Sequence, residues 1–204
     1  MAHVNQQTRE ITCKIVYYGP AMSGKTTNLR WLHRLLRPEF RGELISINTA
    51  GDRTLFMDTL PVQLGSIGGF STKLNIYSVP GQRHYAATRK LVLDGADAVV
   101  FVADAQESML SENASAFADL HEQIAGYGQD PLRVPMVMQY NKLDLPPTDR
   151  TPIDALDRLL NARALPIVPA AAIDGTGVYR TLEVLTQLVF QRLQATHAPS
   201  ARVA

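Results

Sequence analysis

The residues best suited to chemistry form a glycine-rich segment near the N-terminus. Residues 19–26 read Gly-Pro-Ala-Met-Ser-Gly-Lys-Thr and fit the pattern glycine, any four residues, then Gly-Lys-Ser/Thr. Between a strand and a helix, such a loop directs backbone N–H groups and a helix N-terminus at phosphate oxygens. Lys25 would reach the β and γ phosphates, and the Thr26 hydroxyl would be a ligand for Mg²⁺. The predicted phosphate site comprises Gly19, Ala21, Met22, Ser23, Gly24, Lys25, Thr26 and Thr27.

A second motif, Asn141-Lys142-Leu143-Asp144, points to a guanine base. The Asp144 carboxylate could accept hydrogen bonds from N1–H and the 2-amino group of guanine, and adenine offers no such pair of donors. Asn141 and the stem of Lys142 would support the loop and the face of the base. Small residues after the last predicted strand allow a backbone N–H to contact the guanine carbonyl; they are Ala171, Ala172 and Ile173. An ATP-using P-loop enzyme is the alternative, which competition with ATP would decide.

Two further segments carry residues that could promote hydrolysis of a nucleotide. Gly81 could donate its N–H to a γ-phosphate, and Gln82 could orient an attacking water. Thr54 could reach Mg²⁺ and the γ-phosphate, while Arg53 could supply a positive charge to the transition state. The alternatives are a polar surface residue after a turn for Gln82 and a solvated arginine for Arg53.

The pattern of apolar residues predicts the elements that position these motifs. Strands alternate with helices, so we expect a mostly parallel sheet with helices on both faces and ligands beyond the carboxyl ends of its strands. One antiparallel hairpin is expected at its edge, with Gly68-Gly69 as the turn. Strands are expected at residues 11–18, 44–47, 61–67, 73–79, 98–103, 135–140 and 167–172, and helices at residues 25–36, 111–125, 152–160 and 178–193.

Composition narrows the class of protein. The 204 residues suggest one domain, residues 1–195, followed by a flexible tail at residues 196–204. A net charge of +1 without a basic block argues against binding nucleic acid. Cys13 is the only cysteine, which excludes an internal disulfide and a thiolate metal site. No apolar run approaches the ~20 residues of a membrane span, and no signal peptide or lipid anchor motif is visible. We therefore expect a soluble cytoplasmic protein.

The motifs, taken in order, resemble those of the small Ras-like GTPases. More narrowly, the chain resembles the MglA family of bacterial polarity and gliding-motility GTPases over residues 9–193, on segments 14–20, 24–29, 52–56, 79–82, 101–104 and 139–146. The resemblance implies a Ras-like P-loop G domain with a six-strand sheet and five helices. It also implies a switch that binds GTP and GDP with Mg²⁺ and hydrolyses GTP slowly when alone.

The family also implies roles and partners. Switch one would include Arg53 and Thr54, and switch two would include Gln82. Catalysis would use Gln82, Arg53 and Lys25, and the metal would be held by Thr26 and Thr54. The activator would be a roadblock-domain homodimer of the MglB type that lets Arg53 act as the finger. The GTP form would move to a cell pole and recruit effectors of polarity or motility.

Two residues depart from the wider pattern. Ser78 stands where Ras proteins carry an aspartate and MglA proteins usually a threonine, so the usual carboxylate near the metal is missing at that position. Ala21 replaces a glycine beside the γ-phosphate, where a side chain can crowd the glutamine and the finger. An alternative function is therefore a GTP-dependent interaction module with little or no hydrolysis.

Overall fold

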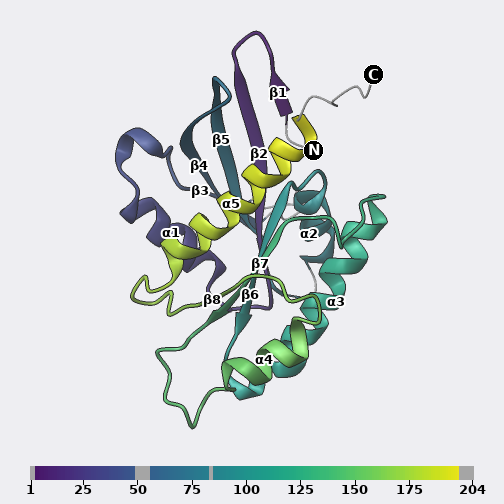
Figure 1. Ribbon diagram of the computed structural model, residues 1–204. Helices are drawn as coiled ribbons and strands as arrows, with labels where there is room; N and C mark the ends of the chain where they lie inside the picture. The colour runs from purple at the N-terminus through teal and green to yellow at the C-terminus, as the bar shows by residue number, and fades with distance from the viewer. Residues whose placement is uncertain (1–2, 49–55, 83–84, 198–204) are drawn as a thin grey trace.

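A computed structural model describes residues 3–48, 56–82 and 85–197, which form one sheet flanked by helices (Figure 1). The strands are β1 (His3–Asn5), β2 (Glu10–Tyr18), β3 (Ile45–Asn48), β4 (Phe56–Ile67), β5 (Phe70–Ser78), β6 (Ala98–Asp104), β7 (Met136–Asn141) and β8 (Ile167–Pro169). The α-helices are α1 (Lys25–Leu35), α2 (Ala86–Leu93), α3 (Leu110–Gly126), α4 (Ile153–Leu160) and α5 (Val178–His197). Short 3₁₀ helices lie at η1 (Pro38–Phe40) and η3 (Glu107–Met109).

The sheet confirms the expected class, although it contains more strands than expected. Its order is β3-β4-β5-β2-β6-β7-β8, with β1 paired to β2 outside this path. Four pairs are parallel, and three are antiparallel: β1–β2, β3–β4 and β4–β5. The family's six strands are present as β2 and β4–β8. The strands β1 and β3 are additional to the six that the resemblance implied, and β3 corresponds to the strand expected at residues 44–47. Strand β3 places the expected hairpin one strand in from the edge.

Alternating side chains along the central strands build a core on each face of the sheet. In β6, Val100 and Val102 lie in one core and Val99 and Phe101 in the other, and all four are fully buried. The first core is covered by α1 and α5, and the second by α2, α3 and α4 (Figure 1). A strand covered on both faces reads as a continuous apolar run, as residues 98–103 do.

The carboxyl ends of four parallel strands meet at one edge of the sheet. Tyr17 lies opposite Ser78, Tyr18 opposite Phe101, and Asp104 opposite Asn141. Since the motifs follow directly after β2, β5 and β7, this register brings them together.

Several boundaries differ from the sequence-based expectation. Strand β4 begins at Phe56 and not at residue 61, and α2 was not predicted. Strand β8 ends at Pro169, because the next residues turn so that the Ala172 N–H donates to the Asn141 side chain. Helix α5 continues to His197, and residues 198–204 of the expected tail lie outside the described residues. None of the helices in the described ranges is long and apolar enough to cross a membrane.

A buried amide pair links the start of α1 to β7. Asn28 and Gln139 donate to each other through their side chains at 2.8 Å in both directions, and both are fully buried. Asn28 also donates to the Gly24 carbonyl at 3.0 Å, and Gln139 donates to the Thr181 hydroxyl on α5 at 2.7 Å. The network fixes the first turn of α1, which begins at the phosphate loop, against the centre of the sheet.

Replacing Gln139 by leucine should therefore destabilise the fold. Gln139→Leu leaves the Asn28 amide buried without its partner, which costs about 1–3 kcal/mol. Urea denaturation measures this loss of unfolding free energy. The control is Gln194→Leu at an exposed position of α5, which should change stability by less than about 0.5 kcal/mol. Equal stability of wild type and Gln139→Leu would show that Asn28 finds another partner.

Candidate functional site

The phosphate loop joins β2 to α1 and ends at Gly24, the N-cap of the helix. Gly24 has φ 101°, a left-handed backbone that favours glycine. A Cβ there would lie 2.2 Å from the Asn141 Nδ2, so a side chain at residue 24 would also collide with the neighbouring motif. The first N–H groups of α1 have no partner within the helix and are available to an anion.

A cavity of about 530 Å³ brings together most of the predicted phosphate-site residues. The loop and the segment after β5 form its walls, which is the arrangement that the sequence predicted for phosphates. The predicted residues that line it are Ala21, Met22, Gly24, Lys25, Thr26, Thr27, Gly81 and Gln82. Met22 is 85% exposed at φ 57°, whereas Ser23 is fully buried. Gly19 lies on a second cavity, of about 560 Å³, on the α3 side of the loop.

Lys25 is buried against the loop that it follows. Its Nζ donates to the Gly19 and Pro20 carbonyls at 3.0 and 2.5 Å. Burial, with a smaller effect from the nearby Arg89 charge, lowers the pKa of Lys25 to about 7, and the Asp104 charge opposes this shift. An anionic phosphate in this cavity would stabilise the ammonium form, because an opposite charge favours the charged state.

The guanine motif is attached to the phosphate loop through Asn141. The buried Asn141 donates from Nδ2 to the Ser23 carbonyl at 2.7 Å, and its Oδ1 accepts from the Ala172 N–H at 2.8 Å. One amide therefore connects the phosphate loop, the end of β7 and the segment after β8. Ala171 and Ala172 are buried, and Ile173 is 71% exposed.

Lys142 and Asp144 occupy different environments after Asn141. The Lys142 Nζ lies 2.5 Å from Oδ2 of the buried Asp104 and donates to Gln106 at 2.8 Å, so its stem lies along the loop. Asp144 is exposed, as a carboxylate that receives a base must be. The roles of both residues toward a guanine base stay predictions.

Asp58 on β4 supplies a carboxylate that the sequence reasoning missed. It lies directly opposite Ser78 in the antiparallel pair. Its Oδ2 accepts from the Thr26 hydroxyl at 2.6 Å and the Ser78 hydroxyl at 2.8 Å, and its Oδ1 accepts from Ser46 at 2.6 Å. Residues 57–60 read Met-Asp-Thr-Leu and show no alternation of apolar and polar residues, so the strand was expected to begin only at residue 61.

This cluster fits a hard cation bound together with phosphates. Oxygen atoms are the ligands that Mg²⁺ prefers, and a protein commonly gives it one or two of them while phosphates and water supply the rest. The Thr26 hydroxyl would ligate the metal, and the Asp58 carboxylate beside it would supply negative charge. Within the described ranges no group of three or more His, Cys, Asp or Glu could form a metal site of its own.

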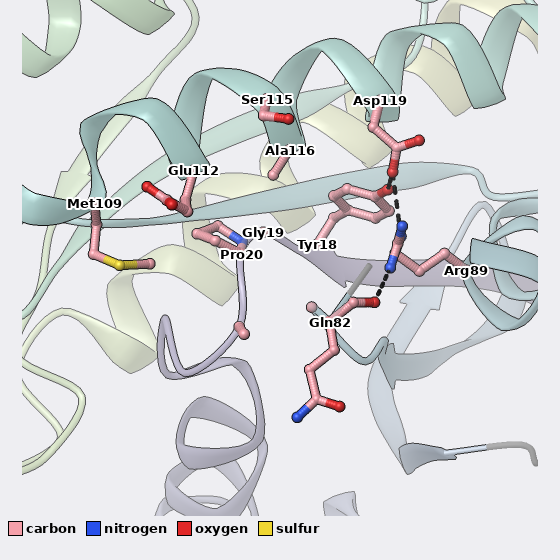
Figure 2. A pocket seen from close by; sticks show the side chains of 12 residues that line it. Tyr18, Gly19, Pro20, Gln82, Arg89, Met109, Glu112, Ser115, Ala116 and Asp119 are labelled. Carbon is pink, nitrogen blue, oxygen red and sulfur yellow. Dashed lines mark hydrogen bonds and ion pairs between the residues drawn. The ribbon is translucent and has the colours of Figure 1, made fainter. Parts of the chain in front are cut away.

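Gly81 packs directly against the phosphate loop. A Cβ at this residue would lie 2.2 Å from the Ala21 nitrogen and 2.3 Å from the Pro20 carbonyl carbon, so only glycine allows this approach. Gln82 is exposed, and its side chain points away from Arg89 and Asp119 (Figure 2). Arg53 and Thr54, predicted for catalysis and metal binding, lie outside the described residues.

The Asp58 cluster predicts a pH-dependent contribution to stability. Burial raises the pKa of Asp58, but hydrogen bonds from Ser46, Thr26 and Ser78 outweigh it and hold the pKa below its ordinary value. A carboxyl whose folded pKa lies below the unfolded value of about 3.9 stabilises the fold above that pH. The contribution disappears as the pH falls through the lower, folded value.

Asp58→Asn should therefore unfold at a lower temperature than wild type at neutral pH. The gap should narrow once the pH drops below about 4, as thermal unfolding over a pH series would measure. Asp154→Asn is the control, because that carboxylate is 69% exposed and pairs only with Arg158 on its own helix. A gap that stays constant with pH would mean that the charge of Asp58 contributes nothing.

The comparisons with known proteins agree with this geometry. No protein-family model matches the chain. The chain is 45% identical over 194 residues to the mutual gliding-motility protein MglA of Myxococcus xanthus (strain DK1622), and the alignment covers 95% of this chain and 98% of that protein. Identity of this extent over nearly the whole of both chains shows a common family. With its P-loop architecture and the two motifs joined at Asn141, the chain belongs to the MglA family of small Ras-like GTPases.

Proposed function

We propose that the protein is a molecular switch that binds GTP or GDP with Mg²⁺ and hydrolyses GTP. The observation that carries this proposal is the Asn141 side chain, which joins the phosphate loop at Ser23 to the guanine-reading segment at Ala172. A guanine on Asp144 and phosphates over Lys25 would belong to one continuous ligand.

The residues around the phosphates would stabilise charge. The Lys25 ammonium and the N–H groups that begin α1 would face the β and γ phosphates. Mg²⁺, when bound, would neutralise phosphate charge. Thr26 would ligate it together with Thr54, and Asp58 would hold the Thr26 hydroxyl in place.

Hydrolysis would transfer the γ-phosphoryl group to water. A bond forms between the water oxygen and the γ-phosphorus, the bond from that phosphorus to the β–γ bridging oxygen breaks, and the water proton leaves with the phosphate product. Gln82 would orient the water, and Arg53 would place positive charge on the transition state in the complex with the activating partner. We expect the rate without a partner to be slow.

The partners follow from the family. The gliding-motility name of the M. xanthus relative supports a role in cell polarity or motility. We infer a roadblock-domain homodimer of the MglB type as activator, and effectors that bind the GTP form. We place the protein in the cytoplasm, with recruitment to a cell pole in the GTP form and without a nucleic-acid partner.

A GTP-dependent interaction module with little hydrolysis is the second candidate. Gly81 lies against Ala21 so closely that no side chain fits between their backbones. The methyl group of Ala21 at this contact could keep Gln82 or Arg53 from the γ-phosphate. Turnover at ordinary GTPase rates would eliminate this candidate.

GTP turnover by the purified protein, alone and with its roadblock partner, tests the switch. Arg53→Ala and Gln82→Ala should each keep nucleotide affinity nearly intact and cut stimulated hydrolysis by orders of magnitude, because both act on the transition state. Ala21→Gly should leave the rate equal or faster. Tight GTP binding without turnover under either condition would favour the interaction module.

The choice of base gives a separate test. Inosine triphosphate lacks the 2-amino group, so the wild-type protein should bind GTP more tightly than it binds this analogue. Asp144→Ala should lose about 10²-fold or more in affinity for GTP and should no longer distinguish the two nucleotides. Competition against a fluorescent GDP derivative measures both affinities, with the exposed Asp154→Asn variant as control. Unchanged discrimination in Asp144→Ala would remove the assigned role of this residue.

A further inference from the structure

Arg89 on α2 holds the backbone on both sides of Gly81. Its guanidinium Nη1 donates to the Gln82 carbonyl at 2.6 Å (Figure 2) and to the Pro80 carbonyl at 3.4 Å. The side chain is 8% exposed, although arginine is rarely buried without partners. The contacts thus bracket the glycine that packs on the phosphate loop.

The other side of the guanidinium is anchored on α3. The Arg89 Nε donates to Asp119 Oδ2 at 3.2 Å, and the same carboxylate oxygen accepts from the Tyr18 hydroxyl. Asp119 Oδ1 accepts from Gln123 at 2.7 Å. Because the buried Tyr18 directly precedes Gly19, this chain of contacts begins and ends at the phosphate loop.

We propose that Arg89 is a positioning residue that holds the Gly81–Gln82 backbone beside the phosphate loop. The side-chain amide of Gln82 would then face the reacting phosphate. The Gln82 side chain is outside the contacts made by Arg89 and lines the phosphate cavity. Arg89 therefore fixes the main chain of Gln82 and leaves its side chain able to orient water. This inference rests on the proposed hydrolytic function.

The arrangement explains why arginine is needed at this position. The planar guanidinium directs separate N–H groups at two carbonyls and one carboxylate, and hydrogen bonds between charged groups are the stronger ones. A lysine ammonium is a single point that cannot span the Asp119 carboxylate and the two carbonyls. An error of about 1 Å in placing a catalytic group can cost about 10²-fold in rate.

The first experiment compares single-turnover and steady-state GTP hydrolysis of the Arg89 variants with wild type. Arg89→Ala should lower kcat by about 10- to 100-fold while KM and nucleotide affinity stay within about threefold, because the hydrogen bonds of Arg89 hold the Gln82 backbone and not the nucleotide. Arg89→Lys should recover only part of the rate. Tyr18→Phe removes only the hydroxyl that donates to Asp119, so it tests the same anchor if Arg89→Ala does not fold. This variant should cause a smaller loss of kcat.

Lys90→Ala is the matched control on the same helix. Lys90 is exposed, and its ammonium lies 6.0 Å from the Tyr127 ring centroid, far from the anchoring contacts. Its hydrolysis rate should equal that of wild type. A loss of nucleotide affinity in Arg89→Ala at unchanged kcat, or equal rates in all variants, would overturn the positioning role.

A double-mutant cycle tests whether Arg89 acts through Gln82. If it does, adding Arg89→Ala to Gln82→Ala should change the residual rate by less than about twofold, because the group being positioned is already absent. Multiplication of the two single losses in the double variant would show that Arg89 acts independently, and would overturn the proposal.

Amide hydrogen exchange separates failure of this inference from failure of the proposed function. The Gly81 and Gln82 amides should exchange at least about tenfold faster in Arg89→Ala, with exchange in β6 unchanged. A wild-type protein that does not bind or hydrolyse GTP would overturn the proposed function, whereas wild-type turnover with unchanged exchange in Arg89→Ala would overturn only the role of Arg89.

Discussion

The Asn141 amide is the contact on which the site depends. It is buried, donates to the Ser23 carbonyl and accepts from the Ala172 N–H, so its donor and its acceptor serve two different loops. A buried polar group must find partners, and here those partners are the segments that form the ligand site. The Asn141 Nδ2 also lies so close to Gly24 that a Cβ at residue 24 would be 2.2 Å from it. The loop after β7, the phosphate loop and the segment after β8 are thus held together by one side chain.

A carboxylate from a different strand lies beside the Thr26 and Ser78 hydroxyls. The sequence has serine at residue 78, which suggested that the carboxylate was missing. Antiparallel pairing of β4 with β5 places Asp58 opposite Ser78, and both the Ser78 and Thr26 hydroxyls donate to it. A carboxylate at this place can therefore come from a residue on the paired strand and need not come from the strand that carries the motif.

The sequence was sufficient to predict the phosphate loop, the central strands and most helices, because each depends on local patterns. Gly24, Lys25 and Asn141 were identified from spacing, and the structure brings them together. Asp58 was missed since its role depends on pairing across a hairpin, and Arg89 since α2 was not predicted and its carbonyl partners carry no side-chain signal. Strand β3 moved the hairpin in from the sheet edge, which periodicity along one segment cannot reveal.

The short N-terminal strand has a consequence for the solution behaviour of the protein. Strand β1 pairs with residues 10–12 of β2, and β6 pairs with β2 only from Ile15 onward. Without this cover, unpaired N–H and C=O groups beside the apolar Ile11 would form an open template for another chain. Removal of β1 would leave the phosphate-loop residues unchanged and expose this edge of β2 to pairing with another molecule. Strand β1 thus covers an edge of β2 that would otherwise be open to pairing with a second molecule.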